Sequence, residues 1–121
     1  MTGRTRRRAR RFGRTAEACC AGLLRLKGFH ILARDFRAPV GEIDIIARRG
    51  AVVAFIEVKA RPSAALAVES LTARQRRRIA RAALAWLQKR PELHRCDQRF
   101  DVMLVAPWKA PRHVIDAWRE S

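Results

Sequence analysis

Gly41-Glu42-Ile43-Asp44-Ile45-Ile46-Ala47, followed after Arg48-Arg49-Gly50-Ala51 by Val52-Val53-Ala54-Phe55-Ile56-Glu57-Val58-Lys59, is the stretch of sequence that decides the fold. Both segments are rich in β-branched residues, and the interval between them is so short that the strands, Glu42 to Ala47 and Val52 to Ala60, must pair antiparallel. A two-residue turn at Arg49-Gly50, or a four-residue turn from Arg48 to Ala51, pairs residues whose numbers sum to 99. This register predicts Asp44 opposite Phe55 and Glu42 opposite Glu57.

The two faces of this predicted hairpin differ in chemistry. Side chains alternate between faces along a strand, so one face is wholly apolar and is expected to lie against the core. The other face is apolar near the turn and charged at its far end, where Glu42, Asp44, Glu57 and Lys59 gather. These four share a face only if the loop holds an even number of residues. The apolar face consists of Ile43, Ile45, Ala47, Val52, Ala54, Ile56 and Val58.

Clustered carboxylates repel one another unless a cation neutralises them. Mg²⁺ binds through one or two carboxylates and completes its shell with water and phosphate oxygens, a set that Asp44 and Glu57 supply, with the Val58 carbonyl as a further ligand. Lys59 lies on the same face, where its ammonium can position or polarise an attacking water. The pattern predicts hydrolysis of a phosphodiester assisted by Mg²⁺ or Mn²⁺. The alternative is a surface ion pair between Glu57 and Lys59, with Asp44 bound to an arginine.

The remaining sequence predicts two helices and three further strands. Glu17 lies in the first turn of the first helix, where a carboxylate favours the helix dipole, but it also borders the apolar stripe and could point toward the sheet edge. Thr72 is placed to cap the second helix, whose first half is basic. The helices are expected at Thr15 to Lys27 and from Thr72 to about Lys89, and the strands at Phe29 to Phe36, Arg99 to Ala106 and His113 to Trp118, with no element from Pro62 to Val68.

The charge of the chain indicates a polyanionic partner. Its 121 residues include 27 Lys and Arg against 11 Asp and Glu, a formal net charge of +16. Such a charge causes strong self-repulsion unless a polyanion binds, and nucleic acid is the leading candidate. The alternative is a set of arginines that only decorates solvated surfaces. Residues 1–12 are predicted to form a disordered basic arm, and residues 13–121 a single domain.

The composition disfavours several classes of protein. The cysteines, Cys19, Cys20 and Cys96, are odd in number and form no CxxC pair, so neither a disulfide framework nor a zinc knuckle fits. The three histidines have no paired spacing and are expected to be structural or exposed. No apolar segment is long enough to cross a bilayer. We therefore expect a cytoplasmic protein, associated with the nucleoid if DNA is its partner, and no membrane partner.

The motifs of the chain resemble those of the PD-(D/E)xK nuclease superfamily, with Asp44 at the first acid and Glu57-Val58-Lys59 at the second acid and the lysine. From Gly13 to Trp118 the sequence looks like the bacterial YraN family. That resemblance rests on the two hairpin motifs quoted above together with Ala16-Glu17, Lys27-Gly28-Phe29, Asp35-Phe36-Arg37, Gln75-Arg76-Arg77 and Arg99-Phe100-Asp101-Val102. The chain departs from the family at Ala16, Asp35 and Arg74, where Gly, Asn and Lys are common.

The resemblance implies a restriction-endonuclease-like α/β fold with a mixed central sheet, flanking helices and the element order α-β-β-β-α-β-β. The family is similar to archaeal Holliday-junction resolvases, which implies an endonuclease acting on DNA, branched DNA in particular, and makes a homodimer plausible. It also implies that Glu17 is an accessory acid of the site and that Gln75 lies near it on a helix. The residues expected to grip phosphates without reading sequence are Arg61, Arg74, Arg76, Arg77 and Arg78.

Two other functions stay open from the sequence alone. One is a nucleic-acid-binding protein that keeps the nuclease fold but cuts poorly or not at all, since it needs the same basic surface. The other is a basic protein associated with RNA or the ribosome. This last reading leaves the clustered carboxylates unexplained, because without a metal they would repel phosphates.

Overall fold

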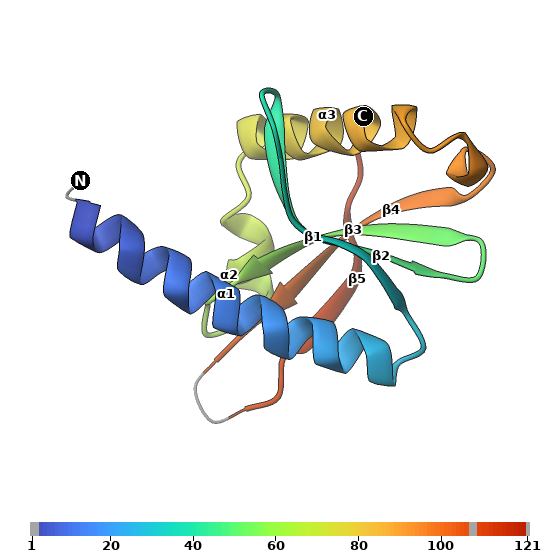
Figure 1. Cartoon of the computed structure of the whole chain (residues 1–121). Coiled ribbons are helices and arrows are strands. Elements are labelled where there is room, and N and C mark those ends of the chain that lie inside the picture. Colours follow the sequence, from blue (N-terminus) through green and yellow to red (C-terminus); the bar gives the residue numbers. More distant parts are fainter. Residues whose placement is uncertain (1–2, 107–108, 121) are drawn as a thin grey trace.

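A mixed β-sheet carries the candidate residues in the computed structural model of the chain. The structure describes residues 3–106 and 109–120, with side chains from Thr15 onward. Within these ranges five strands lie in the order β1-β2-β3-β4-β5, with helices on both faces of the sheet (Figure 1). The strands are β1 (His30–Ala38), β2 (Gly41–Arg49), β3 (Val52–Lys59), β4 (Asp97–Leu104) and β5 (Arg112–Trp118). The helices are α1 (Gly3–Leu26), α2 (Ala64–Glu69) and α3 (Ala73–Gln88), with a 3₁₀ turn, η1, at Pro91–Leu93.

The pairing of the strands confirms the predicted α/β class with a mixed central sheet. β1, β2 and β3 form an antiparallel meander, β3 and β4 are parallel, and β4 and β5 are antiparallel. A parallel pair needs a crossover connection, which α2 and α3 supply. The predicted element order holds except for α2, which lies where no element was expected. Ser63 begins this short helix, because its hydroxyl accepts a hydrogen bond from the Leu66 N–H at 3.2 Å.

Apolar side chains pack on both faces of the sheet. On one face α1 contributes Cys20 and Leu24 to a buried cluster, and on the other α3 contributes Trp86. The predicted single core face therefore describes only half of the packing. The alternation of faces along β2 is also interrupted, because Ile45 packs in the α1 cluster whereas Ile43 packs in the α3 cluster. A sheet covered on both faces leaves only its ends and edges open to a ligand.

α1 is longer than the sequence predicts. The prediction begins this helix at Thr15 and assigns residues 1–12 to a disordered arm, whereas the described backbone is helical from Gly3. Arginine and alanine are good helix formers, so the helix can continue through the basic segment without an apolar stripe to bury. Gly28, with φ +91°, follows the helix in the left-handed conformation that ends many helices, as predicted. No helix in the described residues, α1 included, is long and apolar enough to span a membrane.

The β2–β3 hairpin differs in register from the prediction. Phe55 pairs with Ile46, so the numbers of paired residues sum to 101 rather than 99. The predicted positions of Asp44 opposite Phe55 and of Glu42 opposite Glu57 are therefore wrong. The strands are displaced by two residues relative to the predicted pairing.

The turn explains this error and also what survives it. Gly50, with φ +59°, is the first of two loop residues, where a left-handed residue matches the twist of the strands. The two predicted turns made it the second of two or the third of four loop residues. The loop holds an even number of residues, as predicted, and a displacement of two does not by itself exchange the two faces of the hairpin. One step beyond the last pair, Ile45 with Ile56, the same register sets Asp44 level with Glu57.

Candidate active site

Asp44 is bound to the neighbouring strand by its side chain. The backbone N–H of Val58 donates a hydrogen bond to Asp44 Oδ2 at 2.8 Å. This bond fixes the carboxylate of β2 beside β3, and no arginine in the described part of the chain forms an ion pair with it. Val58 thus acts here through its N–H, and the metal contact expected of its carbonyl stays a prediction.

Glu57 and Lys59 follow on β3 and form a mostly buried ion pair. Lys59 Nζ lies 3.7 Å from Glu57 Oε1, and the two side chains are only 15% and 21% exposed. The ion pair considered as the alternative from sequence therefore exists, but not as a solvated surface pair. Because Glu57 also contacts Asp44, one ammonium serves two carboxyl groups.

Asp44 opposes the ionisation of Glu57. Burial, followed by the negative charge of Asp44, raises the pKa of Glu57 to about 8, while Lys59 lowers it. Burial also raises the pKa of Asp44 above its usual value, although the Val58 N–H counteracts this. A hydrogen bond between the two side chains favours the proton on Glu57 and the charge on Asp44. The pair is therefore short of positive charge.

A cavity of about 270 Å³ opens onto this pair, between the sheet and the first half of α3. It is lined by Glu42, Asp44, Glu57, Gln75, Arg78 and Ile79, so the structure brings four predicted site residues, Asp44, Glu57, Gln75 and Arg78, to one concave surface. A larger cavity, of about 500 Å³, lies at the other end of β3 beside Val52 and Asp97 and contains none of the predicted site residues.

Glu17 of α1 lies beside Asp44 and is only 7% exposed. Burial, followed by the negative charges of Asp44 and Asp35, raises the pKa of Glu17 to about 7. Because α1 begins at Gly3, Glu17 lies in mid-helix rather than in the first turn, so the helix dipole does not explain it. Its side chain points toward the sheet edge, which was the other interpretation, and its accessory role in the chemistry stays a prediction.

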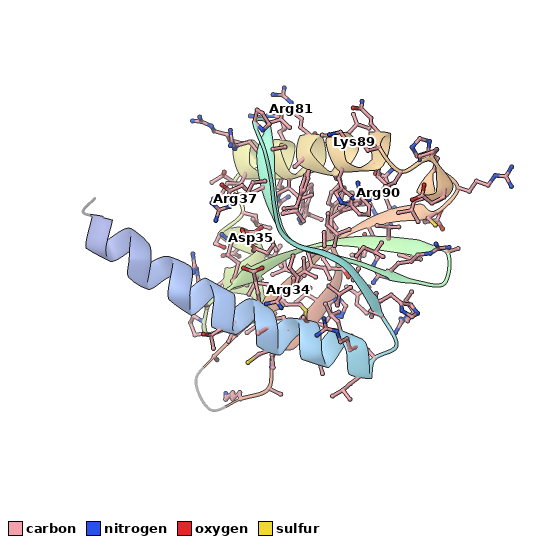
Figure 2. The ribbon with its side chains drawn as sticks, viewed as in Figure 1. Arg34, Asp35, Arg37, Arg81, Lys89 and Arg90 are labelled. Carbon is pink, nitrogen blue, oxygen red and sulfur yellow. The ribbon has the colours of Figure 1, made fainter. Side chains whose placement is uncertain are left out.

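Asp35 joins this cluster and was not predicted as a site residue. It lies on β1 between Arg34 and Phe36, which pair with the residues on either side of Asp44; Figure 2 shows Arg34, Asp35 and Arg37 following one another along this strand. Asp35 has φ +51°, and its backbone N–H is bonded to Glu17. The signal that the sequence offered was an acidic residue within the strand predicted at Phe29 to Phe36. Of the 11 acidic residues in the chain, five gather here: Glu17, Asp35, Glu42, Asp44 and Glu57.

Gln75 has a structural task as well as a place in the cavity. Its side-chain oxygen accepts a hydrogen bond from the Thr72 N–H at 2.9 Å, and the Thr72 hydroxyl accepts one from the Gln75 N–H at 3.1 Å. This reciprocal cap begins α3, as the position of Thr72 predicted. The side-chain amide group of Gln75 remains available toward the cavity, and its functional role stays a prediction.

The predicted phosphate-contacting arginines occupy different environments. Arg74, Arg77 and Arg78 are exposed on α3, and Arg78 lines the cavity. Arg61 is exposed and binds the neighbouring Ala60 carbonyl at 2.8 Å. Arg76 instead lies half-buried with its guanidinium 5.8 Å from the Trp118 ring centroid, and its Nε has no partner. Whether Arg76 contacts phosphate stays a prediction.

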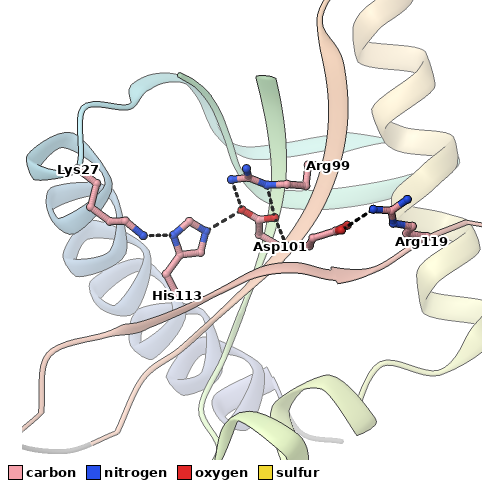
Figure 3. A network of polar contacts seen from close by, with 6 residues as sticks. Lys27, Arg99, Asp101, His113 and Arg119 are labelled. Carbon is pink, nitrogen blue, oxygen red and sulfur yellow. Dashed lines mark hydrogen bonds and ion pairs between the residues drawn. The ribbon is translucent and has the colours of Figure 1, made fainter. Parts of the chain in front are cut away.

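A second buried carboxylate, Asp101 on β4, lies outside the cavity and is fully hydrogen bonded (Figure 3). Arg99 donates to both of its oxygens at 2.9 Å, His113 Nε2 lies 2.7 Å from Oδ2, and the Asp116 N–H donates to Oδ1 at 2.9 Å. The other ring nitrogen of His113 contacts Lys27, which directly follows α1. This network joins β4, β5 and the turn that follows α1, and the sequence did not predict it.

The bonds to Asp101 outweigh the cost of burying it. Burial alone raises the pKa of this carboxyl, but the hydrogen bonds from His113, Arg99 and the Asp116 backbone hold the pKa below its usual value. Asp116 has φ +54° at a point where the β4–β5 register shifts, and its N–H is directed at Asp101. The network therefore stabilises the irregular end of β5 and has the character of a structural site.

No group of three or more His, Cys, Asp or Glu side chains in the described residues is arranged to hold a metal ion. Asp44 and Glu57 are two carboxylates on a cavity, a donor set that suits Mg²⁺ or Mn²⁺ with water and phosphate completing the shell, and does not suit a zinc site with four protein ligands. Their raised pKa values are also what a cation at this place would relieve. The residues present thus fit a weakly held, oxygen-bound divalent cation.

Comparison with known proteins agrees with the family resemblance. Residues 16–105 match the model of Uncharacterised protein family UPF0102. A UPF0102 protein of Paramagnetospirillum magneticum is 52% identical over 120 residues, covering 96% of this chain and 93% of the relative. UPF0102 proteins of Parvibaculum lavamentivorans and a Bradyrhizobium species are 48% and 52% identical over 111 residues, each covering 92% of this chain and 84% and 82% of the relatives. The chain therefore belongs to the UPF0102 family, the family that its hairpin motifs indicated.

Proposed function

We propose that this protein is a metal-dependent endonuclease that hydrolyses DNA phosphodiesters. The observation that carries the proposal is the Asp44–Glu57 pair, held in a cavity with Lys59 beside it, in a chain whose net charge is +16. In so basic a protein, neither solubility nor stability explains a cavity in which two carboxyl groups share a single ammonium group. It is well explained as a cation site at the point where a polyanion binds.

Asp44 and Glu57 would hold Mg²⁺ or Mn²⁺, with the Val58 carbonyl as a further ligand. When bound, the metal would supply Lewis acidity toward a phosphate oxygen and favour a bound water as nucleophile. The Val58 N–H orients Asp44, which keeps one carboxylate in place whether or not the cavity is occupied. Glu17, held beside Asp44, is suited to an accessory role in retaining a proton or a water molecule.

Lys59 is the cation best placed to act on the reacting phosphate. Its ammonium is confined by the ion pair with Glu57 and by its low exposure, so it has little freedom to lose when substrate binds. A confined ammonium next to a metal site can orient the attacking water and offset charge that develops on phosphate oxygens. Arg61, Arg74 and Arg77 would contact phosphates outside the cavity, without reading base sequence.

A non-catalytic or weakly catalytic nucleic-acid-binding protein is the second candidate. One observation favours it, namely that no third His, Cys, Asp or Glu side chain among the described residues completes a metal-binding group. Such a protein would keep the basic surface and bind DNA without cutting it. Binding alone therefore does not separate the two functions, and cleavage does.

The test is a cleavage panel with the purified full chain. Single-stranded, duplex, flap and four-way DNA, together with single-stranded RNA, are incubated with Mg²⁺, with Mn²⁺ or with a chelator. We expect metal-dependent cleavage of DNA, with branched DNA preferred, and a loss of about 10²-fold or more in rate for Lys59→Ala, because a charge-stabilising group is removed.

Lys89→Ala is the matched control, because Lys89 is an exposed lysine at the far end of α3 from the cavity. It should cut at the wild-type rate. If the wild type cuts none of the substrates in any metal but binds DNA, the second candidate is supported and the nuclease proposal fails. Cleavage of RNA in preference to DNA would overturn the assignment of the substrate.

A further inference from the structure

Arg78 differs from the other arginines of α3 in where it lies. It lines the cavity with Glu42, Asp44 and Glu57, yet within the described part of the chain it forms no ion pair or hydrogen bond through its side chain. An exposed arginine beside three carboxyl groups would usually pair with one of them. Its guanidinium is therefore free to bind a group that enters the cavity.

The backbone of Arg78 is held against β2 by an unusually close contact. A Cβ atom built on Gly41 would lie 2.3 Å from the Arg78 carbonyl oxygen and 3.2 Å from the Arg78 Cβ. Only glycine allows α3 to approach β2 this closely. Because Gly41 is three residues from Asp44 on the same strand, this contact fixes the distance between the base of the Arg78 side chain and the carboxylate pair.

The opposing walls of the cavity carry complementary chemistry. The sheet wall presents carboxyl groups, which suit a cation, and the α3 wall presents Arg78 and the Gln75 amide, which are hydrogen-bond donors. A phosphate between the walls would meet the carboxylates and the cation that they would hold on one side, and these donors on the other. The planar guanidinium can bind two phosphate oxygens at once, which an ammonium cannot do in the same geometry.

We propose that Arg78 is a catalytic residue that binds the non-bridging oxygens of the scissile phosphate, while Gly41 positions it. This inference rests on the proposed nuclease function and deepens it. In hydrolysis the water oxygen bonds to phosphorus, the bond from phosphorus to the leaving oxygen breaks, and a proton from water ends on that oxygen. Arg78 takes part in none of these bond changes and stabilises the charge that they place on the phosphate.

The test separates this role from a general grip on DNA. Arg78→Ala, Arg78→Lys and Arg77→Ala are compared by kcat and KM on the best DNA substrate from the cleavage panel. Arg77 is the matched control because it is also exposed on α3 but does not line the cavity. We expect Arg78→Ala to lower kcat by about 10²-fold with little change in KM, because one donor to the transition state is lost.

Arg77→Ala should instead raise KM and leave kcat unchanged. The plot of the logarithm of the DNA-binding constant against the logarithm of salt concentration should become less steep by about one, because one fewer counterion is released. Arg78→Lys should recover part of the lost kcat, since the charge returns without the bidentate geometry. Lys59→Ala is run in parallel.

If the wild type cuts, Lys59→Ala does not, and Arg78→Ala changes KM only, the inference about Arg78 is wrong and the nuclease function stands. If the wild type does not cut at all, the function fails and the inference fails with it. Circular dichroism and thermal unfolding of each variant exclude misfolding, and Arg78→Lys keeps the test valid should Arg78→Ala unfold.

Discussion

The molecule buries carboxyl groups in two places and treats them in opposite ways. Asp101 is completely buried and receives hydrogen bonds from two side chains and a backbone N–H, so its pKa lies below the usual value. Asp44 and Glu57 are also largely buried, but they lie side by side on the sheet wall of a cavity, share Lys59 and have raised pKa values. Burial is common to both places, and a full set of hydrogen bonds is not.

This difference separates a structural acid from a functional one. A carboxylate removed from water must recover its lost hydration from protein donors, and Asp101 does so within the fold. The Asp44–Glu57 pair does not, and that deficit lowers the stability of the folded chain until a cation arrives. Side chains that destabilise the fold where they stand are typical of sites kept for binding or catalysis.

The largest effect should come from replacing Asp44 by asparagine. The loss of one metal ligand should lower the cleavage rate by about 10³-fold, which corresponds to roughly 4 kcal/mol of transition-state stabilisation. DNA binding should hardly change, and the free energy of unfolding should rise slightly, because asparagine can still accept the Val58 N–H and removes the charge that opposes Glu57. Cleavage and binding assays at equal protein concentration measure this. Asp97→Asn, at the far end of the sheet, is the control and should cut normally.

Replacing Asp101 by asparagine should have the reverse pattern. The largely buried Arg99 and His113 lose their charged partner, and breaking a buried charge network in this way costs about 3 kcal/mol or more of unfolding free energy. Cleavage by the folded fraction should be unaffected, since Asp101 lies outside the cavity. Urea denaturation followed by circular dichroism gives the stability. An unchanged denaturation midpoint would show that the two carboxyl clusters do not differ as proposed.

A divalent cation should stabilise one cluster and not the other. At ten times its dissociation constant, Mn²⁺ should add about 1.4 kcal/mol to the stability of the wild type and raise its Tm by roughly 5 °C. Asp101→Asn, although less stable, should gain the same increment, whereas Asp44→Asn should gain none. Thermal unfolding with and without Mn²⁺ tests this. An equal gain in Asp44→Asn would place the cation elsewhere.

The fold and the hairpin motif were readable from sequence because they rest on local rules. The strand alternation and the short interval around Gly50 predict the β2–β3 hairpin, and the face of each side chain depends only on whether the loop is even or odd. The register itself depends on which loop position the glycine occupies, which sequence spacing does not decide. For that reason the face shared by Asp44, Glu57 and Lys59 was predicted correctly and their pairing partners were not.

Contacts between elements distant in sequence were less predictable. Asp35 reaches the site only because β1 pairs beside β2, and Arg78 because Gly41 lets α3 approach so closely. The Asp101 network joins residues 27 to 116, and its residues show no spacing pattern. Arg76 illustrates the same limit, because the helical pattern does not say which arginine of a basic run turns toward Trp118.

The smallest effect that the comparison predicts is on acid stability. Because the pKa of folded Asp101 lies below its usual value, the unfolded chain binds more protons at acid pH, and folding is favoured above about pH 4, the ordinary range of an aspartate. That contribution is lost as the pH falls through the folded pKa of Asp101. Unfolding free energies of the wild type and Asp101→Asn should therefore converge as the pH is lowered from 6 toward 3. Both proteins keep Glu17, Asp44 and Glu57, whose raised pKa values act with the opposite sign, so the difference between the two curves isolates Asp101. A difference that stays constant across this range would mean that Asp101 contributes through its shape and not through its charge.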